Sequence, residues 1–461
     1  MNKFVFCSLS LIAGAAAHLG AAEISSDLQA KIANGGSSKV IITFKDKTNR
    51  GKLAFKGSTA EVRRTLNANY KASSAKVKSI LSFSKTGGGE VVSELPFANA
   101  LVANVSNKTL KDLANNPDIA QITLDRVIMF EETPANSNEE VGSSKDWTYG
   151  LKVLGVDKVR AAYNLTGKGV RVGILDTGID AEHPDLKGKV VAWKDWAGDS
   201  ETPKDAHGHG THCAGTIAGG DASGKNIGVA PEVELVIGRI FGDSGGATLS
   251  GILGAMNWIT DPDSNADTDD APRIVSNSWG GRQGSMQSEK AMWNIIKTWR
   301  SLNMVPVFAA GNSGPRAKTM GTPGGYPHSF AVAATDSKDK AAYFSSRGPI
   351  TWEGVDYVKP DIAAPGVDIY SAKPGGGYQK MSGTSMACPH VSGLAALVLQ
   401  ANPALTVKQV EKALTAYAVD LGAEGKDSTF GEGRVDIKAS IDAIKGVSEK
   451  QQENFDTIYG N

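Results

Sequence analysis

Residues 383–390 have the sequence Gly-Thr-Ser-Met-Ala-Cys-Pro-His, and no other stretch says more about the fold of this chain. The Ser385 hydroxyl lies on a turn of small residues, directly before the apolar, alanine-rich run 391–399. Such a run predicts a buried helix with Ser385 near its start. A serine at a helix N-terminus is most often only a cap, so a chemical role needs support from elsewhere in the sequence.

Two further motifs give that support. Asp176 lies in Val-Gly-Ile-Leu-Asp-Thr-Gly at 172–178, and His209 opens His-Gly-Thr-His-Cys-Ala-Gly at 209–215. A hydroxyl nucleophile, a histidine base and an orienting carboxylate are the groups that acyl transfer requires. We therefore expect Ser385 to be the nucleophile, His209 the base and Asp176 the group that orients the histidine ring.

These motifs, in the chain order Asp, His, Ser, resemble those of the subtilisin-like serine proteases, the subtilases. The resemblance covers residues 150–445 and gives the base to His209, because His207 and His212 are not followed by Gly-Thr-His. It implies an endopeptidase that works through an acyl-enzyme, needs no cofactor for its chemistry and acts as a monomer on protein or peptide substrates.

The segment Ala-Ala-Gly-Asn-Ser-Gly at 309–314 resembles the subtilase oxyanion segment, which makes Asn312 the side-chain donor beside the backbone N–H of Ser385. The substrate should bind as an extended strand. The resemblance places around that strand Ser278, Trp279, Gly280, Ala309, Ala310, Gly311, Gly321, Ser244, Gly245 and Gly246. None of these residues is an acid, so we expect a large apolar or aromatic residue before the cleaved bond rather than Arg or Lys.

Many subtilases carry a structural calcium ion, and the resemblance would take one ligand from Asp185 and others from the loop 220–226. Ala222 stands where a side-chain oxygen is expected, and Lys225 adds a positive charge, so calcium binding stays open. A second acidic stretch, Asp261–Asp270, has five Asp in ten residues. Its composition fits a solvated loop better than a calcium site.

The fold class follows from alternating strand and helix patterns after residue 169. Apolar runs at 170–175, 233–240, 274–276, 305–310 and 330–334 predict central parallel strands. Helical stretches separate several of them, which predicts an α/β fold with a doubly wound, mostly parallel sheet. Ligands bind beyond the carboxyl ends of such strands, where Asp176, Ser278 and Asn312 lie.

Residues 39–130 have the order β-α-β-β-α-β of a small α+β, ferredoxin-like module. At this position the module resembles the subtilase propeptide, or inhibitor I9 domain, which implies an intramolecular chaperone and inhibitor. Residues 31–126 carry 16 Lys/Arg against 7 Asp/Glu, a balance of +9, whereas the residues from Trp147 onward carry 31 against 35, a balance of −4. The two parts could attract each other, or both could simply have solvated surfaces.

The first residues have the pattern of a secretory signal peptide: Lys3, an apolar run at 4–17, and small residues through Ala22. Cleavage after Ala17 or Ala22 fits the small-residue rule, and we favour Ala22 and expect a secreted, extracellular protein. The predicted organisation is a signal peptide (1–22), a propeptide (23–130, core about 39–130), a linker with the processing region (131–146), a peptidase domain (147–446) and a C-terminal tail (447–461).

Composition limits the remaining function classes. The chain has 461 residues, 41% of them hydrophobic, and a net charge of zero, which fits one or two globular domains and suggests no nucleic-acid partner. No later stretch reaches the roughly 18 apolar residues of a membrane span. Once the signal peptide is removed, Cys213 and Cys388 remain. We expect buried free thiols, although a disulfide between them stays open.

Three other interpretations compete with the subtilase one. Sedolisin-type peptidases share the serine motif but use Glu as the base, which His209 argues against. A lipase or esterase needs Gly-x-Ser-x-Gly, which Ala387 breaks. An inactive binding or scaffold module on the same fold would be favoured by a missing triad or oxyanion residue, and none is missing.

Overall fold

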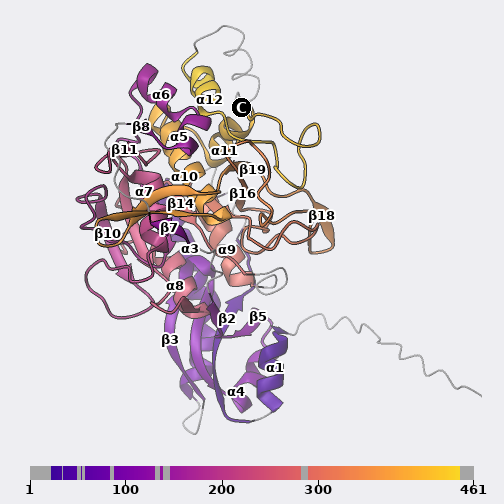
Figure 1. Cartoon of the computed structure of the whole chain (residues 1–461). Coiled ribbons are helices and arrows are strands. Elements are labelled where there is room, and N and C mark those ends of the chain that lie inside the picture. The colour runs from indigo at the N-terminus through magenta and orange to yellow at the C-terminus, as the bar shows by residue number, and fades with distance from the viewer. Residues whose placement is uncertain are drawn as a thin grey trace, which may run out of the picture.

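A computed structural model of the chain describes residues 22–33, 35–48, 53, 58–83, 88–129, 135–138, 146–281 and 289–446. Figure 1 shows two parts, a smaller one at the bottom and a larger one above it. We call residues 22–129 the N-terminal module and residues 146–446 the main domain. Of the expected signal peptide only its last residue, Ala22, is described, and the expected C-terminal tail lies outside the described residues.

The main domain is built on a seven-stranded sheet in which all strands run parallel, in the order β10-β12-β9-β14-β15-β16-β19. The strands are β9 (Arg171–Asp176), β10 (Val190–Asp195), β12 (Glu234–Arg239), β14 (Ile274–Asn277), β15 (Val305–Ala309), β16 (Phe330–Thr335) and β19 (Ile362–Pro365). The sequence pattern found five of these strands and missed β10, which is half-exposed, and the short β19.

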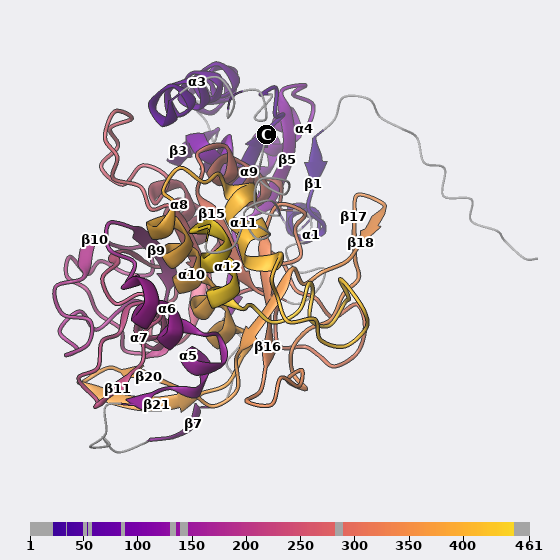
Figure 2. The same ribbon diagram turned by 90° about the horizontal axis from the view of Figure 1, so that it is seen from above.

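Helices cover both faces of this sheet, as Figure 2 shows from above. They are α5 (Tyr149–Val153), α6 (Val156–Tyr163), α7 (His209–Ala218), α8 (Leu249–Trp258), α9 (Lys290–Ser301), α10 (Thr384–Ala401), α11 (Val407–Thr415) and α12 (Ile437–Ile444). Because strand side chains alternate between faces, Ile174 packs in one hydrophobic cluster with α7 and α10, while Leu175 packs in another with α8 and α9. The predicted doubly wound α/β class is confirmed.

The N-terminal module has a sheet of order β1-β5-β2-β4-β3, whose last four strands have the ferredoxin-like arrangement. Its elements are β1 (Glu23–Ile24), α1 (Ser26–Ala33), β2 (Ser37–Phe44), α3 (Thr59–Phe83), β3 (Gly89–Leu95), the 3-10 turn η1 (Pro96–Ala98), β4 (Ala100–Ser106), α4 (Asn107–Ala114) and β5 (Ile119–Leu124). A capping box stabilises the start of α3, because Glu61 N donates to Ser58 Oγ and Ser58 N donates to the Glu61 carboxylate.

The module and the main domain share a hydrophobic cluster. Val62, Phe97 and Val102 of the module pack in the same cluster as Leu253 of α8 and Ile295 of α9. Near the interface the last part of the module is not one continuous strand but is broken into β5 and a separate β6 (Val127–Met129). The break lets β6 leave the module's sheet and pair with the main domain.

Shorter strands complete the chain: β7 (Ala135–Asn138), β8 (Asp146–Trp147), β11 (Lys225–Asn226), β13 (Gly246–Thr248), β17 (Ile350–Trp352), β18 (Val355–Tyr357), β20 (Ile369–Lys373) and β21 (Gly377–Met381). Strand β7 falls within the stretch expected to be a structureless linker; it pairs antiparallel with β21. Among the helices that the structure describes, none is both long and apolar enough for a membrane span.

Candidate active site

The predicted catalytic residues lie near the carboxyl ends of the central strands. β9 ends at Asp176, β14 ends directly before Ser278, and β15 ends three residues before Asn312. Since these strands are neighbours and parallel, their ends meet at one edge of the sheet. The first turns of α7 and α10 bring His209 and Ser385 to the same edge, as the following contacts establish.

Asp176 and His209 form a buried pair. Nδ1 of His209 lies 2.7 Å from Oδ1 of Asp176, and the two side chains are 1% and 0% exposed. An ionised carboxylate only accepts hydrogen bonds, so the histidine donates from Nδ1 and keeps Nε2 as its basic nitrogen. The backbone N–H of Thr177 donates to the same carboxylate oxygen at 2.7 Å. The pair therefore holds the ring in the tautomer that a general base needs.

Ser385 lies beside this pair in the first turn of α10. Its hydroxyl donates to the carbonyl oxygen of Ser278 at 2.9 Å, and the Ser278 hydroxyl donates back to the Ser385 carbonyl at 2.9 Å. Cys213 connects the two helices, because its Sγ lies 3.8 Å from Nδ1 of His209 and 3.5 Å from the Ser385 carbonyl oxygen. The three predicted residues thus belong to one buried cluster.

Asn312 is oriented by the residue that precedes the serine. Its Oδ1 accepts hydrogen bonds from both the backbone N–H and the hydroxyl of Thr384, each at 2.9 Å. With the oxygen held in this way, the NH₂ group of Asn312 is directed away from Thr384. It is thereby available as a donor in the cleft that Asn312 and Ser385 line together.

That cleft contains most of the predicted substrate-binding residues. Its lining is Ser278, Trp279, Gly280, Gly281, Ala309, Gly311, Asn312, Ser313, Gly321, Ser346, Thr384 and Ser385. No charged side chain is in this set. A Cβ on Gly321 would lie 2.5 Å from the Gly281 carbonyl oxygen, and Gly311 has a φ of +100°, so both positions require glycine.

Some placements differ from the sequence analysis. Ala310 is fully buried and does not line the cleft. Gly281, Ser313, Ser346 and Thr384 do line it and were not predicted. Three of them adjoin predicted residues in the sequence, so they could have been predicted from that position. Ser346 is far from the other lining residues in the sequence and is brought to the cleft by the fold, where it accepts a hydrogen bond from the Ser313 backbone N–H.

The predicted residues 244–246 lie outside this cleft, at a strand edge that another strand covers. Gly246 opens β13, which pairs antiparallel with β6 of the N-terminal module, with Gly246 opposite Met129 and Thr248 opposite Val127. Ser244 and Gly245 form the turn before β13, closed by the hydrogen bond from Gly245 N to the Gly242 carbonyl. An extended segment of the chain itself thus lies where we expected a substrate strand.

The residues around Asp185 do not fit a calcium ion. One oxygen of Asp185 accepts from the Ala222 backbone N–H at 2.9 Å, and the other accepts from the Tyr378 hydroxyl at 2.7 Å. The ring of Tyr378 stacks on Tyr370, and the Lys225 ammonium lies 4.9 Å from the centre of the Tyr370 ring. Internal donors therefore occupy both carboxylate oxygens that a metal ion would need.

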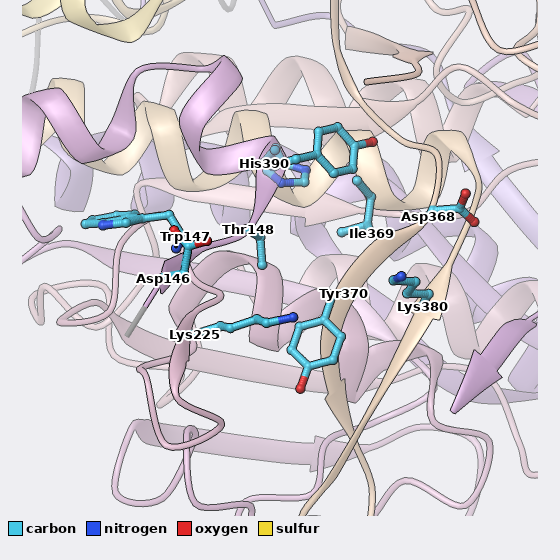
Figure 3. A pocket seen from close by; sticks show the side chains of 11 residues that line it. Asp146, Trp147, Thr148, Lys225, Asp368, Ile369, Tyr370, Lys380 and His390 are labelled. Atoms are coloured by element: carbon cyan, nitrogen blue, oxygen red, sulfur yellow. Dashed lines mark hydrogen bonds between the residues drawn. The ribbon is translucent and has the colours of Figure 1, made fainter. Parts of the chain in front are cut away.

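Lys225 also lines a cavity, which Figure 3 shows from close by. It is lined by Asp146, Trp147, Thr148, Tyr149, Gly150, Lys225, Asp368, Ile369, Tyr370, Lys380 and His390. His390 is fully enclosed there and donates from Nδ1 to the Met386 carbonyl at 2.8 Å; burial lowers its pKa to about 4. A histidine that is neutral at pH 7 and bonded to backbone is a packing group, so we assign no chemistry to this cavity.

His212, Cys213 and Cys388 are packing residues rather than reactive groups. Burial lowers the pKa of His212 to about 3, and its Nε2 donates to the Ile369 carbonyl at 2.8 Å, which fits the structural role expected for it. Cys213 and Cys388 are buried free thiols. Burial raises the pKa of Cys388 to about 11, so this thiol is not a nucleophile at neutral pH.

Comparison with known proteins agrees with this geometry. The model of the subtilase family, Peptidase_S8, matches residues 167–433. The chain belongs to the subtilase family. It is accordingly a serine endopeptidase, a hydrolase of peptide bonds in protein substrates.

Named relatives support the same assignment. Subtilisin DY of Bacillus licheniformis is 37% identical in a match that covers 63% of this chain and 97% of subtilisin DY. Bacillopeptidase F of Bacillus subtilis (strain 168) is 31% identical over 93% of this chain, but the chain spans only 32% of that protein's length. Serine protease AprX of the same organism is 38% identical, with 61% of this chain and 68% of AprX covered.

Proposed function

We propose that this subtilase is a secreted endopeptidase in which Ser385, His209 and Asp176 form the catalytic triad. The observation that carries the proposal is the buried 2.7 Å pair of Asp176 and His209 next to Ser385. The Ser385 hydroxyl rotates from the Ser278 carbonyl towards Nε2 of His209, gives up its proton there and attacks the substrate carbonyl carbon. Asp176 stabilises the imidazolium that results.

The oxygen of the attacked carbonyl becomes negative, and we assign its stabilisation to the NH₂ group of Asn312 and the backbone N–H of Ser385. His209 then gives its proton to the leaving amine as the C–N bond breaks and the acyl-enzyme remains. In the second half of the reaction His209 takes a proton from a water molecule, which attacks the acyl carbon. His209 then returns that proton to the Ser385 oxygen as its bond to the acyl carbon breaks and the carboxylic acid product leaves. Each donor is fixed before substrate binds, which is the arrangement that makes electrostatic stabilisation effective.

The N-terminal module is, in this proposal, a propeptide that the active site itself removes. Two strand pairs support this: β6 pairs with β13, and β7 pairs with β21, which ends four residues before Ser385. Residues 130–134 connect β6 to β7 in the sequence. We therefore propose that the cleaved bond lies between Met129 and Ala135, and that the mature protein begins after it.

The module also completes two helices of the main domain, which supports a chaperone and inhibitor role. Both oxygens of Asp125 accept from Ser250 at the start of α8, from its backbone N–H at 2.8 Å and its hydroxyl at 2.7 Å. At the start of α9, Gln121 accepts from the Lys290 backbone N–H at 3.1 Å. Groups that accept hydrogen bonds from the first turn of a helix stabilise that helix. The module would therefore stabilise α8 and α9 while the main domain folds.

The cleft supports a preference for large apolar or aromatic residues before the cleaved bond. Its glycines leave room for a side chain, and no acid is present to pair with Arg or Lys. A library of peptides that varies this position tests the preference. A clear selection of Arg or Lys would refute the pocket assignment.

A fluorophosphonate probe tests the catalytic assignment, because it labels only an activated serine. The parent should be labelled and Ser385→Ala should not. Ser392→Ala is the matched control, since Ser392 lies on the same helix but bonds to Ser276 in the core. Labelling of Ser385→Ala would overturn the assignment. N-terminal sequencing of the protein from the culture medium tests both secretion and the processing position.

A further inference from the structure

The acidic loop Asp261–Asp270 of the main domain encloses a cation that belongs to the N-terminal module. The cation is the guanidinium of Arg63 on α3, and its side chain is only 3% exposed. Nη1 donates to the Thr268 carbonyl at 2.9 Å and lies 3.6 Å from Oδ1 of Asp261. Nη2 lies 3.7 Å from Oδ1 of Asp270. The loop is therefore part of the contact between the two parts of the chain.

The guanidinium fills this pocket poorly. Within the part of the chain that the structure describes, the facing oxygens Oδ1 of Asp261 and Oδ1 of Asp270 make no hydrogen bond, although both are buried. The same protein contains a well-matched pair for comparison. Arg239 donates from Nη1 to both oxygens of Asp195 at 2.9 and 2.8 Å, with both side chains similarly buried. The pocket thus attracts positive charge without having the geometry of an arginine site.

The oxygens of the loop are arranged for a small cation. Asp261, Asp263 and Asp270 each offer one carboxylate oxygen, and these three atoms lie within 4.8 Å of one another. Calcium binds oxygens at about 2.3–2.6 Å, so two ligands of one ion are at most about 5 Å apart. The Thr268 carbonyl, which now accepts from Arg63, faces the same space. All these ligands are oxygens, which favours Ca²⁺ over transition metals.

Hydrogen bonds inside the loop hold its acids in place. The Asp263 backbone N–H donates to Asp270 Oδ2 at 2.7 Å, and the Thr268 hydroxyl donates to Asp263 Oδ1 at 2.9 Å. Asp261 is 6% exposed, and its carboxylate lies within 4.8 Å of those of Asp263 and Asp270. Loss of Arg63 would leave three close acids without a counter-charge, a state that costs free energy unless a proton or a metal ion replaces the guanidinium.

We propose that Asp261, Asp263, Asp270 and the Thr268 carbonyl form a calcium site that Arg63 blocks while the N-terminal module is attached. When the module leaves, a step that rests on the proposed processing, Ca²⁺ takes the position of the guanidinium. Calcium and the module then compete for one pocket, so calcium in the medium opposes rebinding of the module and stabilises the processed protein.

Calcium titration calorimetry on the full chain tests the site without any need for processing. The Ser385→Ala chain, with its intact mass checked, is compared with the same chain carrying Arg63→Met, which removes the charge and keeps most of the volume. Arg63→Met should bind one additional Ca²⁺, or bind it at least about tenfold more tightly. Arg64→Met is the matched control and should behave like the parent, because Arg64 is exposed and pairs with Asp267 outside the three-acid group.

Adding Asp270→Asn to the Arg63→Met chain should abolish the additional or tighter calcium binding. Terbium luminescence excited through Trp258 gives a second readout at the same place, since the Trp258 indole donates to the Pro262 carbonyl within the loop at 3.1 Å. Equal calcium affinity with and without Arg63, or a gain that survives Asp270→Asn, would overturn the proposal. A chain cut despite Ser385→Ala would instead refute the proposed self-processing, and the intact mass reports that separately.

If Arg63→Met does not fold, as circular dichroism would reveal, the titration is made on the processed protein after its N-terminal residues have been separated. One calcium ion should bind to that protein and be lost in its Asp270→Asn variant. Identical calcium binding by both processed proteins would overturn the proposal.

Discussion

The catalytic cluster and the surface under the N-terminal module obtain their partners in different ways. Asp176 pairs with His209, and Asn312 pairs with Thr384, all within the main domain. At the module interface, Ser250 and the loop Asp261–Asp270 are instead bonded to Asp125 and Arg63 of the module. The comparison indicates that the groups proposed for chemistry are already complete, while the surface under the module would lose bonding partners if the module left, as proposed.

The largest expected effect comes from a change in the catalytic cluster. Ser385→Ala should reduce kcat/KM on peptide substrates by at least about 10⁴-fold, because the other groups then have no nucleophile to act on. Residues 23–130 should stay attached to the protein. The measurement is peptide hydrolysis together with the intact mass of the protein made without other proteases. Mature-length protein from this variant would exclude self-processing.

Asn312→Ala should lower kcat by about 10²–10³ with little change in KM, since its donor is used mainly in the transition state. Steady-state kinetics on the processed enzyme separate the two parameters. The folded structure should survive, because Asn312 is partly exposed and its two bonds go to Thr384 alone. An effect confined to KM would mean that Asn312 only binds substrate.

At the module interface, Asp125→Ala should lower the free energy of unfolding of the Ser385→Ala precursor by about 1.5–3 kcal/mol. This variant removes two hydrogen bonds to a buried carboxylate at the start of α8 and leaves Lys39, 3.0 Å from Asp125, without that partner. Urea denaturation followed by fluorescence gives the value. A change below about 0.5 kcal/mol would show that α8 does not depend on the module.

The smallest effect should come from Arg64→Ala, whose ion pair with Asp267 is exposed on both sides. Such pairs contribute about 0–1 kcal/mol, so urea denaturation of this precursor should nearly match the parent. Arg64 therefore serves as the control for Asp125. A loss as large as that of Asp125→Ala would contradict the distinction between buried and exposed contacts across the interface.

Sequence alone was sufficient for the features that short motifs carry. The strand at 170–175, the turn after it and the helix after Ser385 are each specified by neighbours in the chain, so the fold class and the positions of Asp176, Ser278 and Asn312 after the strand ends could be predicted. The expected oxyanion and pocket segments also lie in one cleft. Periodicity failed for β10 and β19, since β10 is a half-exposed edge strand and β19 has the sequence Ile-Ala-Ala-Pro, in which Ala and Pro are poor strand formers.

Only the tertiary structure could decide contacts between residues far apart in the chain. β7 forms because its backbone pairs with β21, and backbone pairing leaves little trace in side-chain sequence. The Asp185 carboxylate is occupied by the Tyr378 hydroxyl, 193 positions away, which no local motif around either residue records. Arg63 meets Asp261 and Asp270 for the same reason, so the sequence determined that the loop is acidic, and the fold determined which charge it faces.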